Sequence, residues 1–275
     1  KAADDYQDVL RISVARAGND HRLGAAEAPP AIISVFLGDE LTEVLDAIEN
    51  DTPVGQAEKT LFKVGVHALP PFPKDTTDRN RTSPFAYTGA KFEFRMPGSS
   101  ASISSANIAI NTAVAEELRQ FADELEGAED FNQALHTLIR RVVREHRRII
   151  FNGNGYDPSW VDEAARRGLH NLRSTPEALP HLTDPENVEL FTRHRVFSEG
   201  ELHARQEVFQ EEYCKRVTIE GRTALVMARR EILPAASRFA SQLAAAAAAQ
   251  RAVMPERRAR YECSTLGSLT QLMDA

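Results

Sequence analysis

Hydrophobic positions follow two different periods along this chain, and the change between them predicts how it is organised. In the first part, the short apolar runs IISVFL (residues 32–37) and LFKVGV (residues 61–66) contain β-branched residues and predict buried strands. From residue 103 onward, apolar positions recur every three or four residues, which is the period of an amphipathic helix. The pattern therefore predicts an α+β fold with its strands early and its long helices late.

Residues that cap or break helices set the expected helix ends. Gly18 is expected to end a first helix that begins at Asp4, because glycine readily adopts the left-handed conformation of a helix end. Pro234 is expected to break or kink the last long helix, because proline cannot donate to the helix ladder. The predicted helices cover residues 4–17, 39–49, 103–125, 129–149, 158–166 with Asp157 as N-cap, 198–233 with the capping pair Ser198 and Glu201, and the alanine run 244–249.

Composition shifts near residue 150. Strands, loops and concentrated charged motifs precede that point, and long amphipathic helices follow it, with no internal repeat. The arginine-rich run RRVVREHRR, at residues 140–148, is expected to form a solvated face or to pair with nearby acidic helices. We therefore expect two regions, residues 1–150 and residues 151–275.

The segment AYTGAKFEFRMPG alternates charged and aromatic side chains at a period of two. On a strand, Lys91, Glu93 and Arg95 would project from one face. Phe92 and Phe94 would project from the other. Such a charged face can simply be solvated, with its opposite charges forming a ladder. A long irregular segment rich in Pro, Asp and Thr leads into this strand, and loops of that length in compact domains are usually functional or disordered.

Two loops carry further charged residues that suit a polyanionic ligand. NDHRLGAAEAP contains Arg22 and Glu27. KDTTDRNRTSP contains Arg79 and Arg81. Arginine pairs bidentately with carboxylate and phosphate oxygens, so several arginines in one pocket would neutralise a multiply charged substrate. Glu93 would oppose an anion directly, but a carboxylate beside phosphates can hold Mg²⁺ or Mn²⁺. The alternatives are a local salt bridge in the first loop and solvated arginines in the second.

Three other candidates give weaker evidence of a binding or catalytic role. His21 fits a hydrogen bond within its loop, and His67 fits a core or solvent-facing strand position. The glycine-rich NGNG, at residues 152–155, lacks the Lys-Ser/Thr end of a phosphate-binding loop. We therefore assign these residues no ligand.

Composition limits the class of protein. With 275 residues, 42% of them hydrophobic, and a net charge of −7, the chain is typical of globular proteins and unlike disordered or nucleic-acid-coating ones. Its two cysteines, Cys214 and Cys263, lie far apart without metal-ligand spacing. No apolar run reaches the about 20 residues of a membrane span, and no signal-peptide pattern opens the chain. We expect a cytoplasmic protein with no nucleic-acid or membrane partner.

Three segments together resemble the type III glutamine synthetases, the large bacterial branch of that family. They are NDHRLGAAEAPPAIISVFLG, PKDTTDRNRTSPFAYTGAKFEFR and IIFNGNGYDPSWVDEAARRGLHNL, and they span most of residues 3–182. The first two resemble the family's pattern of an arginine and a flap glutamate before Ala-Pro, an Asn-Arg-Ser/Thr loop, and a strand ending in Glu-x-Arg. The third resembles the type III branch. The resemblance implies a partial antiparallel catalytic sheet with flanking helices in residues 1–150 and the branch's helical carboxy-terminal extension in residues 151–275.

The resemblance implies ATP-dependent ligation of ammonia to L-glutamate through a γ-glutamyl phosphate, which gives glutamine. In that reaction the γ-carboxylate is phosphorylated, and ammonia then displaces the phosphate. The roles it implies are catalysis by Glu27, Arg81 and Arg95, glutamate binding by Arg22, Glu27 and Arg95, ATP contacts by Arg81 and Lys91, and ligation of Mg²⁺ or Mn²⁺ by Glu93.

Two departures from the family pattern affect what this chain is expected to do. Ala26 stands in the flap loop where the branch has asparagine, and the family's upstream metal carboxylates, metal histidine and small amino-terminal sheet domain do not occur in the sequence. We expect a fragment that is inactive alone, from a homo-oligomer that forms rings with active sites at subunit borders. The alternatives are a non-catalytic helical assembly or regulatory module and a γ-glutamyl-polyamine ligase.

Overall fold

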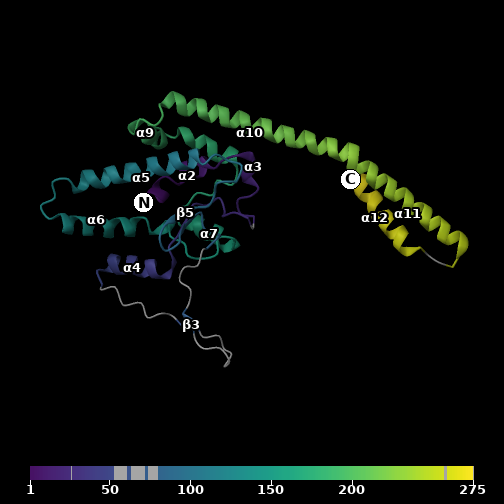
Figure 1. Ribbon diagram of the computed structural model, residues 1–275, viewed down its shortest axis with the longest axis horizontal. Helices are drawn as coiled ribbons and strands as arrows, with labels where there is room; N and C mark the ends of the chain where they lie inside the picture. The colour runs from purple at the N-terminus through teal and green to yellow at the C-terminus, as the bar shows by residue number, and fades with distance from the viewer. Residues whose placement is uncertain (26, 53–60, 63–71, 74–79, 257–258, 275) are drawn as a thin grey trace. The chain divides into compact units, whose positions relative to one another are not determined.

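The computed structural model describes residues 1–275 except 26, 53–60, 63–71, 74–79, 257–258 and 275 (Figure 1). Ala26, His67 and Arg79 therefore lie outside the described residues, as does much of the irregular segment before residue 80. The chain divides into two compact units, Lys1–Tyr213 and Cys214–Ala275. The expected division near residue 150 lies between a catalytic-domain part and a helical extension, which need not coincide with compact units. It stays a prediction.

The main sheet has three strands in the order β1 (Val35–Phe36), β4 (Phe85–Tyr87) and β5 (Phe92–Phe94). β4 and β5 are antiparallel, but β1 and β4 are parallel. The expected antiparallel sheet is therefore only partly correct, because the described sheet is mixed. The chain between β1 and β4 includes helix α4 (Gly38–Asn50), and a crossover of that length can return the next strand in the same direction.

A second, two-stranded sheet pairs β2 (Leu61–Phe62) with β3 (Phe72–Pro73) in antiparallel register. The strand predicted at residues 61–66 is thus confirmed at its first two residues, and residues 63–66 lie outside the described part of the chain.

Aromatic pairs hold the hairpin of β4 and β5 together. Phe85 stacks on Phe94 with ring centroids 4.5 Å apart, and the Tyr87 and Phe92 rings lie 5.2 Å apart. Ala86 pairs with Glu93 on the other face of the hairpin. The predicted alternation of aromatic and charged side chains along this strand is therefore confirmed.

The prediction of one continuous first helix is wrong. The helix is interrupted at Tyr6 and again after Ser13, and Gly18 lies inside a helical turn instead of ending one. The observed pieces are α1 (Ala2–Asp5), α2 (Gln7–Ser13) and α3 (Ala17–Asp20).

Side chains replace helix hydrogen bonds at both interruptions. Gln7 Nε2 donates to the Asp4 carbonyl at 3.2 Å, and Asn19 Nδ2 donates to the Val14 carbonyl at 3.0 Å. Asn19 Nδ2 also donates to the Met96 carbonyl at 3.1 Å. Asn19 thus ties the end of α2 to the segment after β5, and a glycine cap is not needed there.

The later helices follow the sequence signals closely. The Asp157 carboxylate accepts from Ser159 N at 2.9 Å, and Ser198 with Glu201 forms the expected reciprocal cap. A π-helical turn lies just before Pro234, so the predicted interruption occurs there while the chain stays helical. The predicted helices are observed as α5 (Ser104–Leu125), α6 (Phe131–Glu145), η1 (Arg147–Ile149), α7 (Pro158–Arg166), α10 (Glu199–Met227), η3 (Ala228–Ile232) and α11 (Leu233–Val253, which includes the alanine run). Four further helices among the described residues were not predicted: α8 (Thr175–Ala178), η2 (Leu179–Thr183), α9 (Pro185–Arg193) and α12 (Arg260–Asp274).

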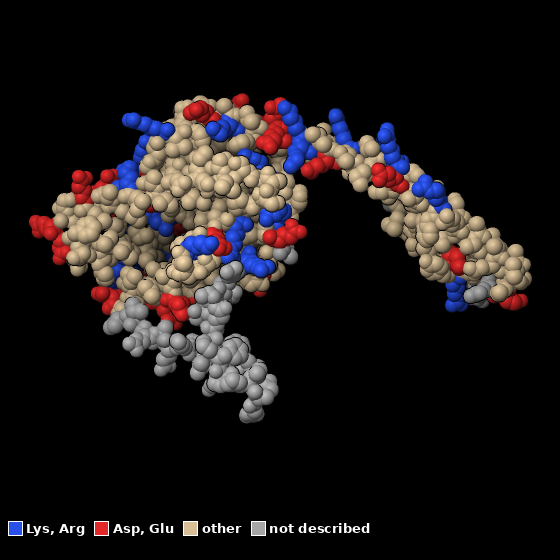
Figure 2. Space-filling model, viewed as in Figure 1, with Lys and Arg blue, Asp and Glu red and all other residues tan. Residues whose placement is uncertain are grey.

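The arginine-rich run at residues 140–148 pairs with acidic side chains, as predicted. Arg147 contacts Asp46 and Glu49 of α4, each at 2.6 Å, and Arg140 donates to the Glu49 carbonyl at 3.0 Å. Helices α4, α6 and α5 consequently lie side by side in the first unit (Figure 1). Acidic and basic side chains also mingle on the face shown in Figure 2, which agrees with the small net charge.

The core of the first unit surrounds helix α2. Val9, Leu10 and Ile12 are at most 4% exposed, and they belong to one apolar cluster that also contains Trp160 and Leu202. Such close packing fixes the helices against the small sheet.

No helix in the described part of the chain is long and apolar enough to cross a membrane. Cys214 and Cys263 are both free.

A buried carboxylate joins α5 to the end of α9. Glu116 is 1% exposed, and it accepts from Arg119, Gln120 and Arg193 at 2.6–3.1 Å. His194 Nε2 lies 2.8 Å from the same carboxylate. The Arg119 hydrogen bonds are the largest cause that holds the pKa of Glu116 well below its ordinary value of 4.5.

We predict that Glu116→Gln lowers the free energy of unfolding by about 2 kcal/mol, because it leaves charged donors without their carboxylate. The depressed pKa means that the ionised carboxylate stabilises the fold above its ordinary pKa, and that this contribution falls as the pH drops below about 4.5. Urea unfolding at pH 7 and pH 4, followed by circular dichroism, measures both effects. The control is Glu189→Gln, which removes an exposed Arg193 pair and should cost under about 1 kcal/mol. Equal losses for the two variants would contradict the prediction.

Candidate functional site

The three charged residues of the β5 segment form one continuous ion-paired row. Arg95 donates to Glu93 Oε2 from Nη2 at 2.9 Å and from Nε at 3.2 Å. Lys91 Nζ lies 3.4 Å from Glu93 Oε1. The side chains become less exposed along the row, from 70% at Lys91 to 36% at Glu93 and 17% at Arg95. The predicted trio therefore exists, with its carboxylate between two cations.

The electrostatics keep Glu93 ionised. Its pKa is lowered from the ordinary value, chiefly by the hydrogen bonds from Arg95 and to a smaller extent by Lys91, against the opposing effect of desolvation. A carboxylate held charged in this way can bind a cation, or it can fix a guanidinium in one orientation.

Arg95 connects the row to the turn that contains Arg81. Its Nη1 donates to the Asn80 carbonyl at 2.8 Å, while Asn80 Oδ1 accepts from Thr82 N at 3.0 Å. Arg81 is exposed in this turn. The structure therefore brings the Asn-Arg-Thr loop to the charged face of β5.

Arg22 lies at the end of the same strand. Its Nη1 donates to Asn19 Oδ1 at 2.5 Å and lies 3.5 Å from the carbonyl of Met96, which directly follows Arg95. A Cβ on Gly98 would come within 3.6 Å of the same nitrogen. Segments from two distant motifs thus meet at the end of β5.

Glu27 stands apart from this group. It is exposed on a tight loop that closes where Gly24 N donates to the Pro29 carbonyl at 3.0 Å. Among the described residues, its carboxylate makes no hydrogen bond or ion pair. The suggested local salt bridge with Arg22 is therefore not formed. His21 is exposed in the preceding turn.

Sequence reasoning missed the structural role of the NGNG loop. Ile150 pairs with Val35 in parallel, and Phe151 N donates to the Val35 carbonyl at 3.0 Å, so this segment lies beside β1. Asn152 Oδ1 accepts from Leu37 N at 3.0 Å and from Gly38 N at 3.2 Å, which caps α4. The Asn and Gly composition of the loop did predict a turn. It could not predict the loop's hydrogen-bond partners, because they lie far away in the sequence.

The same loop supports the Asn80–Thr82 turn. Asn80 Nδ2 donates to the Gly153 carbonyl at 2.7 Å, and Gly155 N donates to Thr82 Oγ1 at 2.7 Å. The third motif therefore holds the second motif in place.

Two other groups of residues have the types of side chain that bind metals. In the first group, His146 contacts Asp4 and Asp5, but Arg148 also donates to Asp4 at 2.8 Å and already compensates its charge. The second group contains Asp8, His181 and Asp184. His181 Nδ1 lies 2.7 Å from Asp184 and 4.0 Å from Asp8, and a histidine–aspartate hydrogen bond explains that geometry without an ion.

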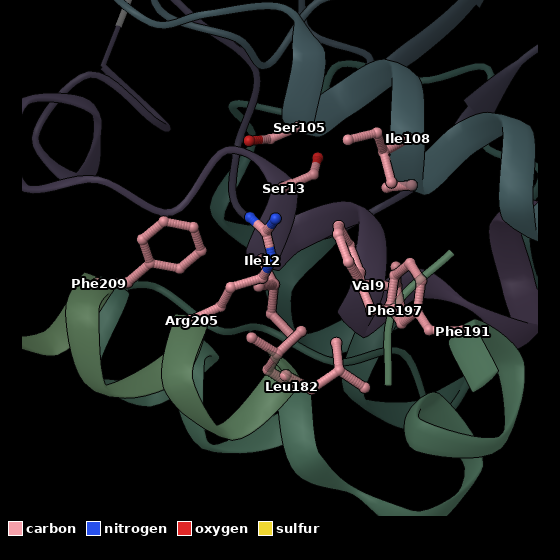
Figure 3. A pocket seen from close by; sticks show the side chains of 12 residues that line it. Val9, Ile12, Ser13, Ser105, Ile108, Leu182, Phe191, Phe197, Arg205 and Phe209 are labelled. Atoms are coloured by element: carbon pink, nitrogen blue, oxygen red, sulfur yellow. The ribbon is translucent and has the colours of Figure 1, made fainter. Parts of the chain in front are cut away.

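An apolar cavity of about 60 Å³ lies among α2, α5, α9 and α10 (Figure 3). Val9, Phe191 and Phe197 point into it, and Arg205 lies at its side over the Phe197 ring at 4.0 Å. None of the six predicted site residues lines this cavity, so it contributes nothing to the charged site.

We predict that Asn152→Ala lowers the free energy of unfolding by about 1 kcal/mol, because it leaves the backbone N–H groups of Leu37 and Gly38, at the start of α4, without this acceptor. Urea unfolding measures the loss. Asn50→Ala is the control, since it removes an exposed bond to the Asp46 carbonyl and should change stability by less than about 0.5 kcal/mol. A loss no larger than that of the control would show that Asn152 does not anchor the loop.

Comparison with known proteins agrees with the motifs. Residues 134–251 match the family described as the glutamine synthetase C-terminal domain. A protein named type-3 glutamine synthetase from Dictyostelium discoideum is 44% identical over 238 residues, which cover 86% of this chain and 32% of that protein. A glutamine synthetase from Bacteroides fragilis is 44% identical over 86% of this chain and 34% of its own length, and one from Butyrivibrio fibrisolvens is 41% identical over 84% and 33%. The chain spans about a third of the length of these curated relatives. Over most of its length the chain is therefore similar to proteins named glutamine synthetase, which include a type 3 enzyme, in agreement with the resemblance of its motifs.

Proposed function

We propose that this chain supplies part of the active site of a glutamine synthetase. The reaction is the ATP-dependent ligation of ammonia to L-glutamate through a γ-glutamyl phosphate. Because the chain corresponds to about a third of its relatives, the remaining groups of the site come from elsewhere in a complete protein. We expect that protein to be a ringed homo-oligomer with active sites at subunit borders.

The convergence at the end of β5 carries this proposal. Arg22 Nη1 contacts the carbonyl of Met96, the residue after Arg95, although the two arginines are 73 positions apart in the sequence. Arg95 also reaches the turn that presents Arg81. Two of the three substrates of the proposed reaction, ATP and glutamate, are anions, and three guanidinium groups around one strand end would bind and orient them.

Each arginine has a role that its position supports. Arg95 is largely buried and already fixed by Glu93 and Asn80, so it would bind glutamate and stabilise charge on the transferring phosphoryl group. Arg22, near the Met96 carbonyl, would bind the α-carboxylate. Arg81 is exposed, and it would contact the phosphates together with Lys91.

Glu93 would supply one carboxylate ligand to a divalent cation. Its carboxylate is ionised and partly exposed, and the Oε1 atom has only a long 3.4 Å contact with Lys91 among the described ion pairs. One carboxylate does not complete a coordination sphere for Mg²⁺ or Mn²⁺, so further ligands would come from the rest of the protein. When bound, the ion would neutralise phosphate charge.

Glu27 would act as the flap. Its carboxylate is exposed at the tip of a short loop, which leaves it available to a neighbouring ligand or subunit. In the proposed reaction it would cover the acyl phosphate, exclude water and accept a proton from ammonium.

We predict that Glu93→Gln lowers kcat/KM by about 100-fold and raises the metal concentration needed for half-maximal activity. The assay uses a full-length protein, called the graft below, in which this chain replaces the matching segment of the Bacteroides fragilis relative. The reaction contains ATP, glutamate, ammonia and Mg²⁺ or Mn²⁺. Glutamine and phosphate are measured together.

The control for this variant is Glu145→Gln, an exposed carboxylate on α6, which should leave activity unchanged. Full activity of Glu93→Gln would remove the metal assignment. Faster ligation of a polyamine than of ammonia by the unsubstituted graft would favour the polyamine ligase instead.

We predict a different defect for Glu27→Gln. The variant should still consume ATP, but less glutamine should form per phosphate released, because water reaches the intermediate and ammonium keeps its proton. The ratio of glutamine to phosphate is the measurement, and Glu126→Gln, an exposed carboxylate at the end of α5, is the control. An unchanged ratio for Glu27→Gln would rule out the flap assignment.

A further inference from the structure

We propose that Thr82 and Gly155 are positioning residues, which together set the orientation of Arg95 through the Asn80 turn. This inference rests on the proposed function of Arg95. It assigns a task to the NGNG loop, which has no phosphate-binding pattern and contacts none of the six predicted site residues in the described hydrogen bonds.

The Thr82 hydroxyl lies in the middle of a short chain of hydrogen bonds. It donates to Asn80 Oδ1 at 2.6 Å, and it accepts from Gly155 N at 2.7 Å. Asn80 Oδ1 also accepts from Thr82 N, so the side chain of Asn80 is held within its own turn. Removal of the hydroxyl therefore breaks two bonds at once.

The Asn80 side chain and main chain face two different partners. The side-chain amide donates to the Gly153 carbonyl at 2.7 Å, whereas the main-chain carbonyl accepts from Arg95 Nη1 at 2.8 Å. A rotation of this turn would consequently move the acceptor that holds Arg95. Arg95 in turn donates to Glu93, so its orientation also affects the carboxylate.

Position 155 requires glycine, because a side chain would not fit at this contact. A Cβ at this position would lie 2.5 Å from the Thr82 carbonyl oxygen and 3.3 Å from Pro30 Cδ. The first contact is with backbone, which cannot rotate away. Pro30 follows the loop that carries Glu27, so Gly155 touches both charged segments of the candidate site.

The loop is rigid enough to act as a support. Phe151 joins the sheet beside β1 and stacks on the buried Trp160 with ring centroids 3.7 Å apart. Asn152 is bonded to the first residues of α4. A support of this kind transmits a small displacement to the residues that it holds.

The test compares Thr82→Val with Thr82→Ser in the full-length graft. Valine keeps the size of threonine but removes both hydrogen bonds, so kcat should fall by about 10- to 100-fold. Serine keeps the hydroxyl, and it should restore kcat to within about twofold of the unsubstituted graft. Because the same turn carries Arg81, which is proposed to contact the phosphates, the KM for ATP should rise as well in Thr82→Val, and Thr82→Ser should restore both values.

A second pair of variants tests the steric contact. Gly155→Ala should lower kcat in the same way, whereas Gly200→Ala, where nothing lies within 4 Å of the added Cβ, should leave it unchanged. Thermal melting and the oligomer size of each variant identify any loss that comes from unfolding. Hydrogen exchange of the peptide that contains Gly155 should become faster in Thr82→Val.

The outcomes separate this inference from the proposed function. A folded but inactive unsubstituted graft would refute both. An active graft in which Thr82→Val keeps full kcat would refute only the positioning role. A fall in kcat that Thr82→Ser fails to restore would also refute it, because the hydroxyl would then not be the cause. Loss in Thr82→Val and Gly155→Ala, with rescue by serine, would support it.

Discussion

The guanidinium group of Arg95 is the interaction on which the candidate site depends. Two of its nitrogens donate to the Glu93 carboxylate and a third donates to the Asn80 carbonyl, so one side chain ties the strand to the turn before it. A lysine ammonium could not make these three contacts from fixed directions, because its donors do not lie in one planar fork. Glu93 and Asn80 therefore restrict the orientation of the cation before any substrate arrives.

This arrangement places charged groups on loops and a strand end while the rest of the unit holds them in place. Helix α2 and its neighbours bury the apolar cluster, and the segment after η1 lies beside β1 at the sheet. Loops carry chemistry well when a packed scaffold fixes their ends. Here the third sequence motif belongs to the scaffold, and the first two present the charges.

The sequence predicted the parts of the fold that local chemistry decides. The caps at Asp157 and at Ser198 act over three residues or fewer, so they could be identified without a structure. The end of α2 could not, because Asn19 bonds it to the distant Met96 carbonyl as well. The parallel pairing of β1 is equally non-local. For the candidate site, alternation predicted the trio, but the support from Gly153 and Gly155 involves partners 73 positions away.

Exposure explains why the three charges of this row are not equivalent. Lys91 is mostly in water, where its attraction to Glu93 is weakened by the high dielectric constant and by salt. Arg95 is more than four-fifths buried, so its bonds to Glu93 are less screened. The pKa of Glu93 accordingly responds first to Arg95 and only then to Lys91. A strand face that merely kept the protein soluble would leave all three side chains in water. The burial of one cation at the end of the row, against a backbone carbonyl, distinguishes this strand from a solvated charge ladder.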